Sequence, residues 1–327
     1  MANHSQNIGI IDFKDAYGLI SVQGRDAALF LQGQLTADIR EITTNQPAFS
    51  AYCNHKGRIR TLCRIFLLND TYYLQLPQSL ISSILTLLKQ MAKFSKVSIN
   101  AVGNEWRQLG IIFPTSETHA LKFLSEITHK NPDIIQIPYP DSSDHSRITY
   151  IGSQDILNPY WEKLTKAADR TTFEVWKSFD IKAGIPEIFP ETFEKFLPHY
   201  LNLPALGAVS FKKGCYCGQE IIARMEYRTT IKRHLYCAVL FEANEIPLPG
   251  TPIWIDNPQQ ESVGTVVNAV RTAETSNAIE MLIEILDSVL ENHQKPYIAF
   301  KNLEHHSNPK AHIITGITST NFGIYAS

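Results

Sequence analysis

The densest chemistry of this chain lies in Phe211-Lys-Lys-Gly-Cys-Tyr-Cys-Gly-Gln-Glu-Ile-Ile-Ala-Arg224, where a cysteine directly follows a Lys-Lys-Gly run. Gly214 and Gly218 bracket Cys215, and glycine lets a backbone turn sharply or approach another group closely. From Gln219 onward the residue types favour a helix. The sequence therefore predicts a tight loop that leads into a helix, with the cysteine just ahead of the helix.

Two interpretations of Cys215 follow from this setting. A helix N-terminus and the neighbouring cations Lys212 and Lys213 would favour the thiolate, which is how a reactive cysteine is built. Alternatively, the loop is a tight turn around a buried thiol, because free cysteine is among the most buried residue types. The residues alone leave both interpretations open.

Length and composition limit the possible classes of protein. The chain has 327 residues, enough for two or three domains, and a hydrophobic fraction of 44%, which is ordinary for a globular protein. Its formal net charge of -2 favours neither a nucleic-acid partner nor a membrane partner. No charged-then-apolar leader and no apolar run of membrane-spanning length is visible, and the scattered cysteines indicate reduced thiols, so we expect a cytoplasmic protein.

Cysteine and arginine placement gives two further expectations. The five cysteines are odd in number and scattered, which indicates reduced thiols. Cys215 and Cys217 form a C-x-C pair, but no second close pair of cysteines completes a metal site, so we expect no metal. Arg224 and Arg228 add to a local basic cluster, which suits an anionic ligand or is a solvated face.

The order of predicted elements indicates an α+β protein with an all-β end. The first part reads strand, strand, helix and strand, and a similar pattern follows it, as in ferredoxin-like lobes. After residue 231 short strands punctuated by Pro and Gly suggest a small antiparallel barrel. The elements expected with most detail are strands at 18–24, 71–76, 234–241, 251–255, 264–269 and 278–286, and helices at 79–94, 116–128, 159–168 and 172–183.

The segment Lys213-Gly-Cys-Tyr-x-Gly-Gln-Glu220 resembles the signature of the YgfZ family of folate-binding proteins, relatives of the aminomethyltransferase (T-protein) of the glycine cleavage system. The run Leu31-Gln-Gly-Gln-Leu-Thr-Ala-Asp38 is also similar to that family, and the resemblance extends from about Tyr17 to at least Val267. Members of the family are linked to the upkeep of iron–sulfur enzymes, including one that thiolates and methylates tRNA.

The resemblance implies a three-lobed, T-protein-like fold. Two intertwined ferredoxin-like α+β lobes would occupy residues 1–230, and a C-terminal antiparallel β-barrel would occupy residues 231–327. The lobes would surround a central opening in which tetrahydrofolate, or another folate derivative, sits beside the signature cysteine.

The resemblance also assigns roles to individual residues. Cys215 would be the reactive thiol, and Lys213 would lower its pKa or pair with an anion. Tyr17 and Trp176 would line the folate pocket, because a flat side chain can stack on a pterin, while Phe173 and Phe179 would be core. Arg224 and Arg228 would meet the glutamate tail of the folate or a partner protein. The residues expected to shape the loop are Gly214, Tyr216, Gly218, Gln219 and Glu220.

Four departures from the family pattern put parts of this assignment in question. Thr61-Leu62 stands where the transferases carry an aspartate pair, and neither residue can hold or move a proton as a carboxylate does. Lys182 replaces an acidic residue that can bind the pterin, with Asp180 as a candidate substitute. Cys217 stands where Thr is frequent, and Thr229 stands where many members have Gly.

The sequence thus favours a folate-binding protein that supports iron–sulfur enzymes and, through them, tRNA modification. Its expected partners are folate and iron–sulfur proteins or cluster-assembly factors, without direct nucleic-acid or membrane binding. An aminomethyltransferase is the first alternative, and Thr61-Leu62 counts against it. A non-catalytic scaffold for cluster-assembly proteins is the second, and it differs only in whether Cys215 reacts.

Overall fold

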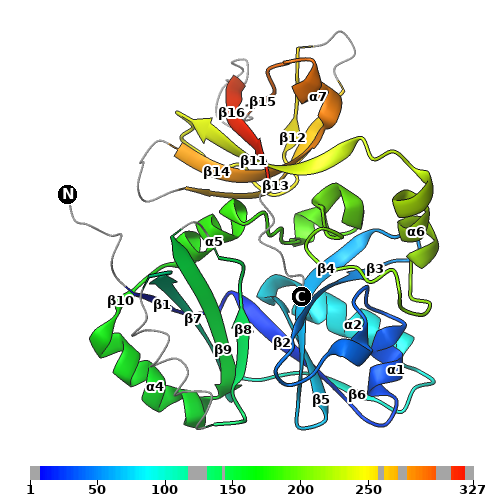
Figure 1. Cartoon of the computed structure of the whole chain (residues 1–327), viewed down its shortest axis with the longest axis vertical. Coiled ribbons are helices and arrows are strands. Elements are labelled where there is room, and N and C mark those ends of the chain that lie inside the picture. Colours follow the sequence, from blue (N-terminus) through cyan, green and yellow to red (C-terminus); the bar gives the residue numbers. More distant parts are fainter. Residues whose placement is uncertain are drawn as a thin grey trace.

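The computed structural model describes residues 8–116, 131–141, 144–256, 261–271, 278–299 and 311–320. Three β-sheets organise these residues: two lie side by side, and the third lies above them in Figure 1. The helix expected at 116–128 falls outside the described residues, apart from its first position. Among the described helices, none is long and apolar enough to cross a membrane.

The first sheet is fully antiparallel and has the strand order β3-β4-β5-β2-β6. Helix α2 covers it with Ile81, Ile84 and Leu88, the apolar positions expected from helical spacing. The elements of this lobe are β2 (Tyr17–Gln23), α1 (Ala27–Gln32), a 3-10 helix (Ile39–Glu41), β3 (Ala48–Cys53), β4 (Ile59–Leu68), β5 (Thr71–Pro77), a 3-10 helix (Gln78–Leu80), α2 (Ile81–Met91) and β6 (Ser98–Ala101).

The second sheet has the order β10-β1-β7-β9-β8, and it takes its second strand from the start of the chain. Strand β1 pairs with β7 and β10, although β2, which follows it directly, belongs to the first sheet. Strand β1 is not among the strands that the sequence predicts. The elements are β1 (Gly9–Asp12), β7 (Trp106–Pro114), β8 (Ile135–Pro138), β9 (His145–Ser153), α4 (Gln154–Ala167), β10 (Asp169–Arg170) and α5 (Phe173–Lys182).

The third sheet is the expected antiparallel barrel, with the order β12-β13-β14-β11-β16-β15. A bridge between Trp254, which follows β12, and Tyr297 in β15 brings its two edges together and nearly closes it. Inward-facing residues such as Val266, Met281 and Ile283 form a separate core. The elements are β11 (Arg233–Phe241), β12 (Pro252–Ile253), β13 (Gly264–Arg271), β14 (Ala278–Leu286), α7 (Asp287–Glu291), β15 (Tyr297–Ala299) and β16 (Ala311–Ser319).

A long connection joins the lobes to the barrel. Helix α5 lies beneath the barrel and packs against β13 and β14, whereas α6 (Gln219–Arg228) lies at the right-hand edge of the molecule in Figure 1. Between them the chain forms 3-10 helices at Pro190–Thr192 and Pro198–Leu201. The predicted fold class, two α+β lobes with a C-terminal antiparallel barrel, is confirmed. The domain boundary at residue 230 stays a prediction.

Candidate functional site

The signature loop, residues 211–218, is anchored to the first lobe by a buried lysine. The Nζ atom of Lys213 donates to the carbonyl oxygens of Leu35 and Ala37, each at 2.7 Å, and the residue is 6% exposed. Burial lowers the pKa of Lys213 to about 8. Its charge also lies over the ring of buried Tyr216, 5.1 Å from the centroid. Lys213 therefore fixes the loop in place.

The expectation that Lys213 lowers the pKa of Cys215 or pairs with an anion stays a prediction, and the structure gives Lys213 an anchoring role. Two of its three donors are bound to carbonyl oxygens of the first lobe, and its side chain is turned into the protein. The side chain of Cys215, in contrast, is exposed. The interpretation of Cys215 as a buried structural thiol is therefore wrong, while its reactivity stays a prediction.

The two glycines of the loop differ in what they require. Gly218 has φ +85°, and a Cβ atom there would lie 2.5 Å from the carbonyl oxygen of Asn54 and 2.9 Å from Cα of Gly57. Only glycine fits this left-handed close approach to the β3–β4 turn. At Gly214, no described atom lies within 4 Å of an added Cβ, so that position has room for a side chain. The expected need for glycine thus holds at Gly218 and fails at Gly214.

We predict that Gly218→Ala lowers the free energy of unfolding by about 1–3 kcal/mol, because the added methyl group combines backbone strain with a clash against Asn54. Gly214→Ala, four residues away in the same loop, should stay within about 0.5 kcal/mol of the wild type. Urea unfolding of the two variants checks this difference. Equal effects would contradict the assigned loop conformation.

Helix α6 starts at Gln219, as predicted, and buries Ile222 and Met225. Arg224 and Arg228 lie on its exposed surface, as does Glu220 near the start of the helix. Figure 1 places α6 at the edge of the molecule, well away from α5, which carries Trp176. The structure therefore does not bring these two arginines to the aromatic residues assigned to folate.

Trp176 belongs to the core. Its side chain is fully buried, and Phe13 and Tyr139 each meet it edge to face at 4.9 Å between ring centroids. The ring of Trp176 has no exposed surface in this structure, and its assignment as a ligand-facing residue stays a prediction. Phe173 and Phe179, which were expected to be core, are only partly buried.

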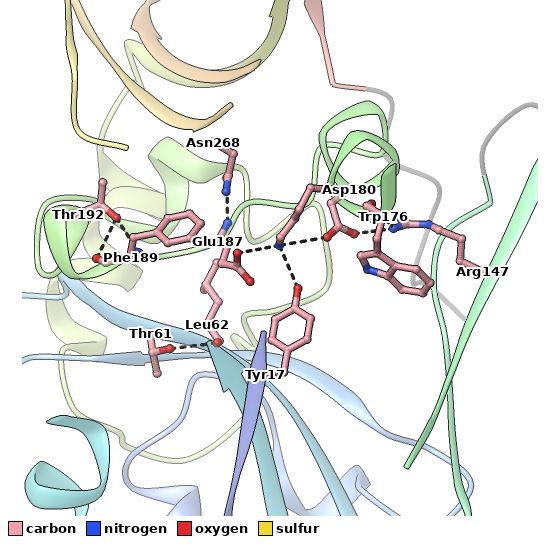
Figure 2. A network of polar contacts seen from close by, with 11 residues as sticks. Tyr17, Thr61, Leu62, Arg147, Trp176, Asp180, Glu187, Phe189, Thr192 and Asn268 are labelled. Atoms are coloured by element: carbon pink, nitrogen blue, oxygen red, sulfur yellow. Dashed lines mark hydrogen bonds and ion pairs between the residues drawn. The ribbon is translucent and has the colours of Figure 1, made fainter. Parts of the chain in front are cut away.

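Tyr17 lies in the same aromatic cluster and ends in a charged network (Figure 2). Its hydroxyl accepts a hydrogen bond from Lys177 Nζ at 2.9 Å, and its ring meets Phe173 edge to face at 5.7 Å. Burial raises the pKa of Tyr17 well above its ordinary value, and nearby Glu187 adds to the effect. The tyrosine is therefore a neutral member of a buried network, with 4% of its surface exposed.

The network holds two cations and two anions between the lobes and the barrel. Asp180 accepts from Arg147 at 2.7 Å and from Lys177 at 3.3 Å, and Lys177 reaches Glu187 Oε2 at 2.7 Å. Burial alone would raise the pKa of Asp180, but Arg147 and Lys177 hold it below its ordinary value. Such a cluster of buried titratable groups is frequent at functional sites. No motif in the sequence pointed to it.

A cavity of about 570 Å³ opens beside this network. Phe173, Phe189 and Trp161 contribute aromatic surface to its lining, and Glu187 contributes a carboxylate. Its lining residues come from the start of the chain, from the end of β5 and from the region of α4 and α5, and none belongs to the signature loop. The expectation that the ligand site lies beside Cys215 stays a prediction, and this cavity is a second candidate for the site.

The comparisons with known proteins give the family. The model of the GCVT N-terminal domain matches residues 1–150. The chain is 32% identical over 293 residues to the tRNA-modifying protein YgfZ of Photorhabdus laumondii, a match that covers 85% of this chain and 84% of the relative. The chain belongs to the YgfZ family. A second relative, the tRNA-modifying protein YgfZ of Escherichia fergusonii, is 30% identical over 82% of this chain and 83% of its own length.

The fold is that of the glycine cleavage T-protein. The crystal structure of aminomethyltransferase T from Bartonella henselae matches with a TM-score of 0.70, covering 98% of this chain and 88% of that one, at 11% sequence identity. At this identity the likeness concerns the fold alone. It confirms the predicted three-lobed, T-protein-like architecture of this YgfZ family member.

The aspartate pair of the transferases has no counterpart at its expected place in this YgfZ chain. Thr61 and Leu62 lie in β4, and both are buried. The hydroxyl of Thr61 donates to the carbonyl oxygen of Leu62 at 3.1 Å (Figure 2). A hydroxyl engaged in this way and an apolar side chain offer no proton acceptor of carboxylate strength.

The other departures also have structural consequences. Lys182 pairs with Glu280 of the barrel at 3.4 Å, so it serves the contact between α5 and β14. Asp180 is not the free substitute acid that was considered, because Arg147 and Lys177 occupy its two oxygens. Cys217 is half-buried, its amide donates to the carbonyl oxygen of Gly33, and burial raises the pKa of its thiol.

Proposed function

We propose that this YgfZ family member binds a tetrahydrofolate derivative and supports the assembly or repair of iron–sulfur enzymes, and thereby tRNA modification, through the thiol of Cys215. The observation that carries the proposal is the exposed side chain of Cys215 on an anchored loop. Free cysteine is usually buried, so an exposed thiol in a fixed position suits reaction with another protein. The relatives, which are named tRNA-modifying proteins, support the link to tRNA.

The loop around Cys215 is held on both sides. Lys213 fixes it to the first lobe, the amide of Cys217 binds the carbonyl oxygen of Gly33, and Gly218 packs against the β3–β4 turn. Ordering the loop in advance lowers the conformational entropy lost when a partner docks. The thiol would therefore meet a partner protein without rearrangement of its own backbone.

The cavity beside α5 supports the folate part of the proposal. Its volume of about 570 Å³ lies within the range of small-molecule sites, about 300–1,000 Å³. Aromatic rings for stacking and a carboxylate for hydrogen bonds are the groups that a pterin ring requires. Phe173, Phe189 and Glu187 supply them here, so the residues present fit a folate.

An aminomethyltransferase activity is not proposed, because Thr61 and Leu62 replace the carboxylates expected at the reacting end of the folate. A scaffold that only docks cluster-assembly proteins remains the second candidate, since an exposed loop could serve as a contact surface without reacting. The two functions differ only in whether the sulfur atom of Cys215 reacts.

We predict that Cys215→Ser abolishes rescue of an iron–sulfur tRNA-thiolating enzyme in cells that lack the native protein, because serine cannot form a thiolate. Cys217→Ser is the matched control two residues away, and its half-buried thiol with a raised pKa should be dispensable. Alkylation and mass spectrometry of the purified protein should label Cys215 before the buried Cys53 and Cys63. Full rescue by Cys215→Ser would leave the scaffold function.

A further inference from the structure

We propose that Glu187 is the carboxylate that receives the N–H donors of the pterin in the cavity beside α5. This inference rests on the proposed folate binding and adds the residue that orients the ligand. Position 182, where the resemblance places an acid, holds a lysine that faces the barrel. The required acid is instead supplied five positions further along the chain.

The barrel and helix α5 together hold Glu187 in position. Its backbone N–H donates to Oδ1 of Asn268 in β13 at 3.0 Å, and its Oε2 accepts from Lys177 Nζ at 2.7 Å (Figure 2). The side chain is 9% exposed. A ligand-binding acid fixed at both its backbone and its side chain is preorganised for one orientation.

Lys177 has no donor left for a ligand. Its ammonium group has three N–H donors, and Tyr17, Asp180 and Glu187 accept them. Among the described residues, no hydrogen bond is found to the second oxygen of Glu187, Oε1, and Glu187 lines the cavity. The remaining lone pairs of Glu187 are therefore the acceptors that the network offers to the cavity.

A pterin matches this arrangement in shape and in hydrogen bonding. One edge of its ring carries an amino group and a neighbouring ring N–H, two donors directed the same way, and a carboxylate accepts such a pair. The faces of the ring need flat apolar partners, and Phe173 and Phe189 line the same cavity. An ammonium group in the place of Glu187 would direct its own N–H donors at the N–H donors of the pterin, and no hydrogen bond could form.

The other acids near the cavity are committed or exposed. Both oxygens of Asp180 are bound by cations, and Asp12 accepts two hydrogen bonds from Arg107, at 3.0 and 2.8 Å. Asp15 lines the cavity but is exposed to water, which weakens any hydrogen bond it makes. Glu187 combines burial, fixed orientation and an available oxygen.

The test is calorimetric titration of the full chain with 5-formyltetrahydrofolate. Glu187→Gln should weaken binding roughly 10- to 100-fold, the range expected for lost hydrogen bonds to a charged group, because the new amide sets N–H donors against those of the pterin. Glu191→Gln, the same substitution at an exposed position outside the cavity lining, should change affinity less than about threefold. Thermal unfolding of both variants verifies that they are folded.

A ligand-side change tests the same contact without any mutation. A 2-desamino analogue of the folate lacks the exocyclic amino donor, so wild type should bind it more weakly than the parent compound. Glu187→Gln should bind the two compounds nearly alike, because the contact is already lost in this variant. If Glu187→Gln does not fold, the weaker binding of the analogue by wild type still tests the contact.

The outcomes separate the inference from the proposed function. If wild type binds 5-formyltetrahydrofolate and Glu187→Gln binds it equally well, Glu187 does not accept hydrogen bonds from the pterin, and the proposed folate binding is unaffected. Equal affinity of wild type for the parent and desamino compounds has the same meaning. If wild type binds neither compound, both the proposed folate function and this inference are overturned.

Discussion

Replacement of Asp180 by alanine is expected to lower the free energy of unfolding by about 3–5 kcal/mol. Asp180 is 3% exposed, and its carboxylate is the shared partner of Arg147 and Lys177. Without it, the guanidinium group of Arg147, whose side chain is 1% exposed, would stay buried beside aromatic rings without its ion-pair partner. Leaving a buried charge uncompensated costs far more than losing a surface ion pair.

Chemical unfolding in urea, followed by circular dichroism, measures this loss. Glu174→Ala is the matched control, because it removes an acid from the same helix at an exposed position and should cost less than about 1 kcal/mol. A loss for Asp180→Ala no larger than that of the control would show that the network contributes little to stability.

Trp176→Ala is expected to destabilise the protein by about 3–5 kcal/mol, because it removes the largest fully buried side chain among the described residues and leaves a cavity between Phe13 and Tyr139. Trp176→Phe should cost less, since a ring remains and the indole Nε1 has no hydrogen-bond partner among the described groups. Denaturant unfolding of both variants shows which substitution lowers the free energy of unfolding more. If Trp176 faced a ligand, Trp176→Ala would weaken folate binding and leave stability nearly unchanged.

The features that depend on neighbours in sequence could be predicted well. The start of α6 at Gln219 and the close approach at Gly218 follow from residues within a few positions. The barrel strands could be predicted because Pro and Gly separate short apolar runs. The exposure of Cys215 could not, since the same tight loop can hold a thiol inside or outside.

The features that depend on long-range packing could not be predicted. Helical spacing shows that Phe173, Trp176 and Phe179 share one side of α5, but not which of them the neighbouring sheet covers. Trp176, and not Phe173 or Phe179, is fully buried because Arg147 and Tyr139, which are distant in sequence, pack against its ring. Glu187 lies in a loop, and its role depends on contacts with the barrel and α5 that no local pattern announces.

The place of β1 also determines the order in which the chain can fold during synthesis. Gly9 pairs with Ile112 on one side and with Asp169 on the other, so this strand leaves the ribosome long before either partner exists. The first sheet, whose strands end at Ala101, can form completely while β1 is still unpaired. Contacts between residues so distant in sequence slow folding. The segment that forms β1 is therefore the part of the nascent chain that most needs protection from non-native contacts before its two partner strands are synthesised.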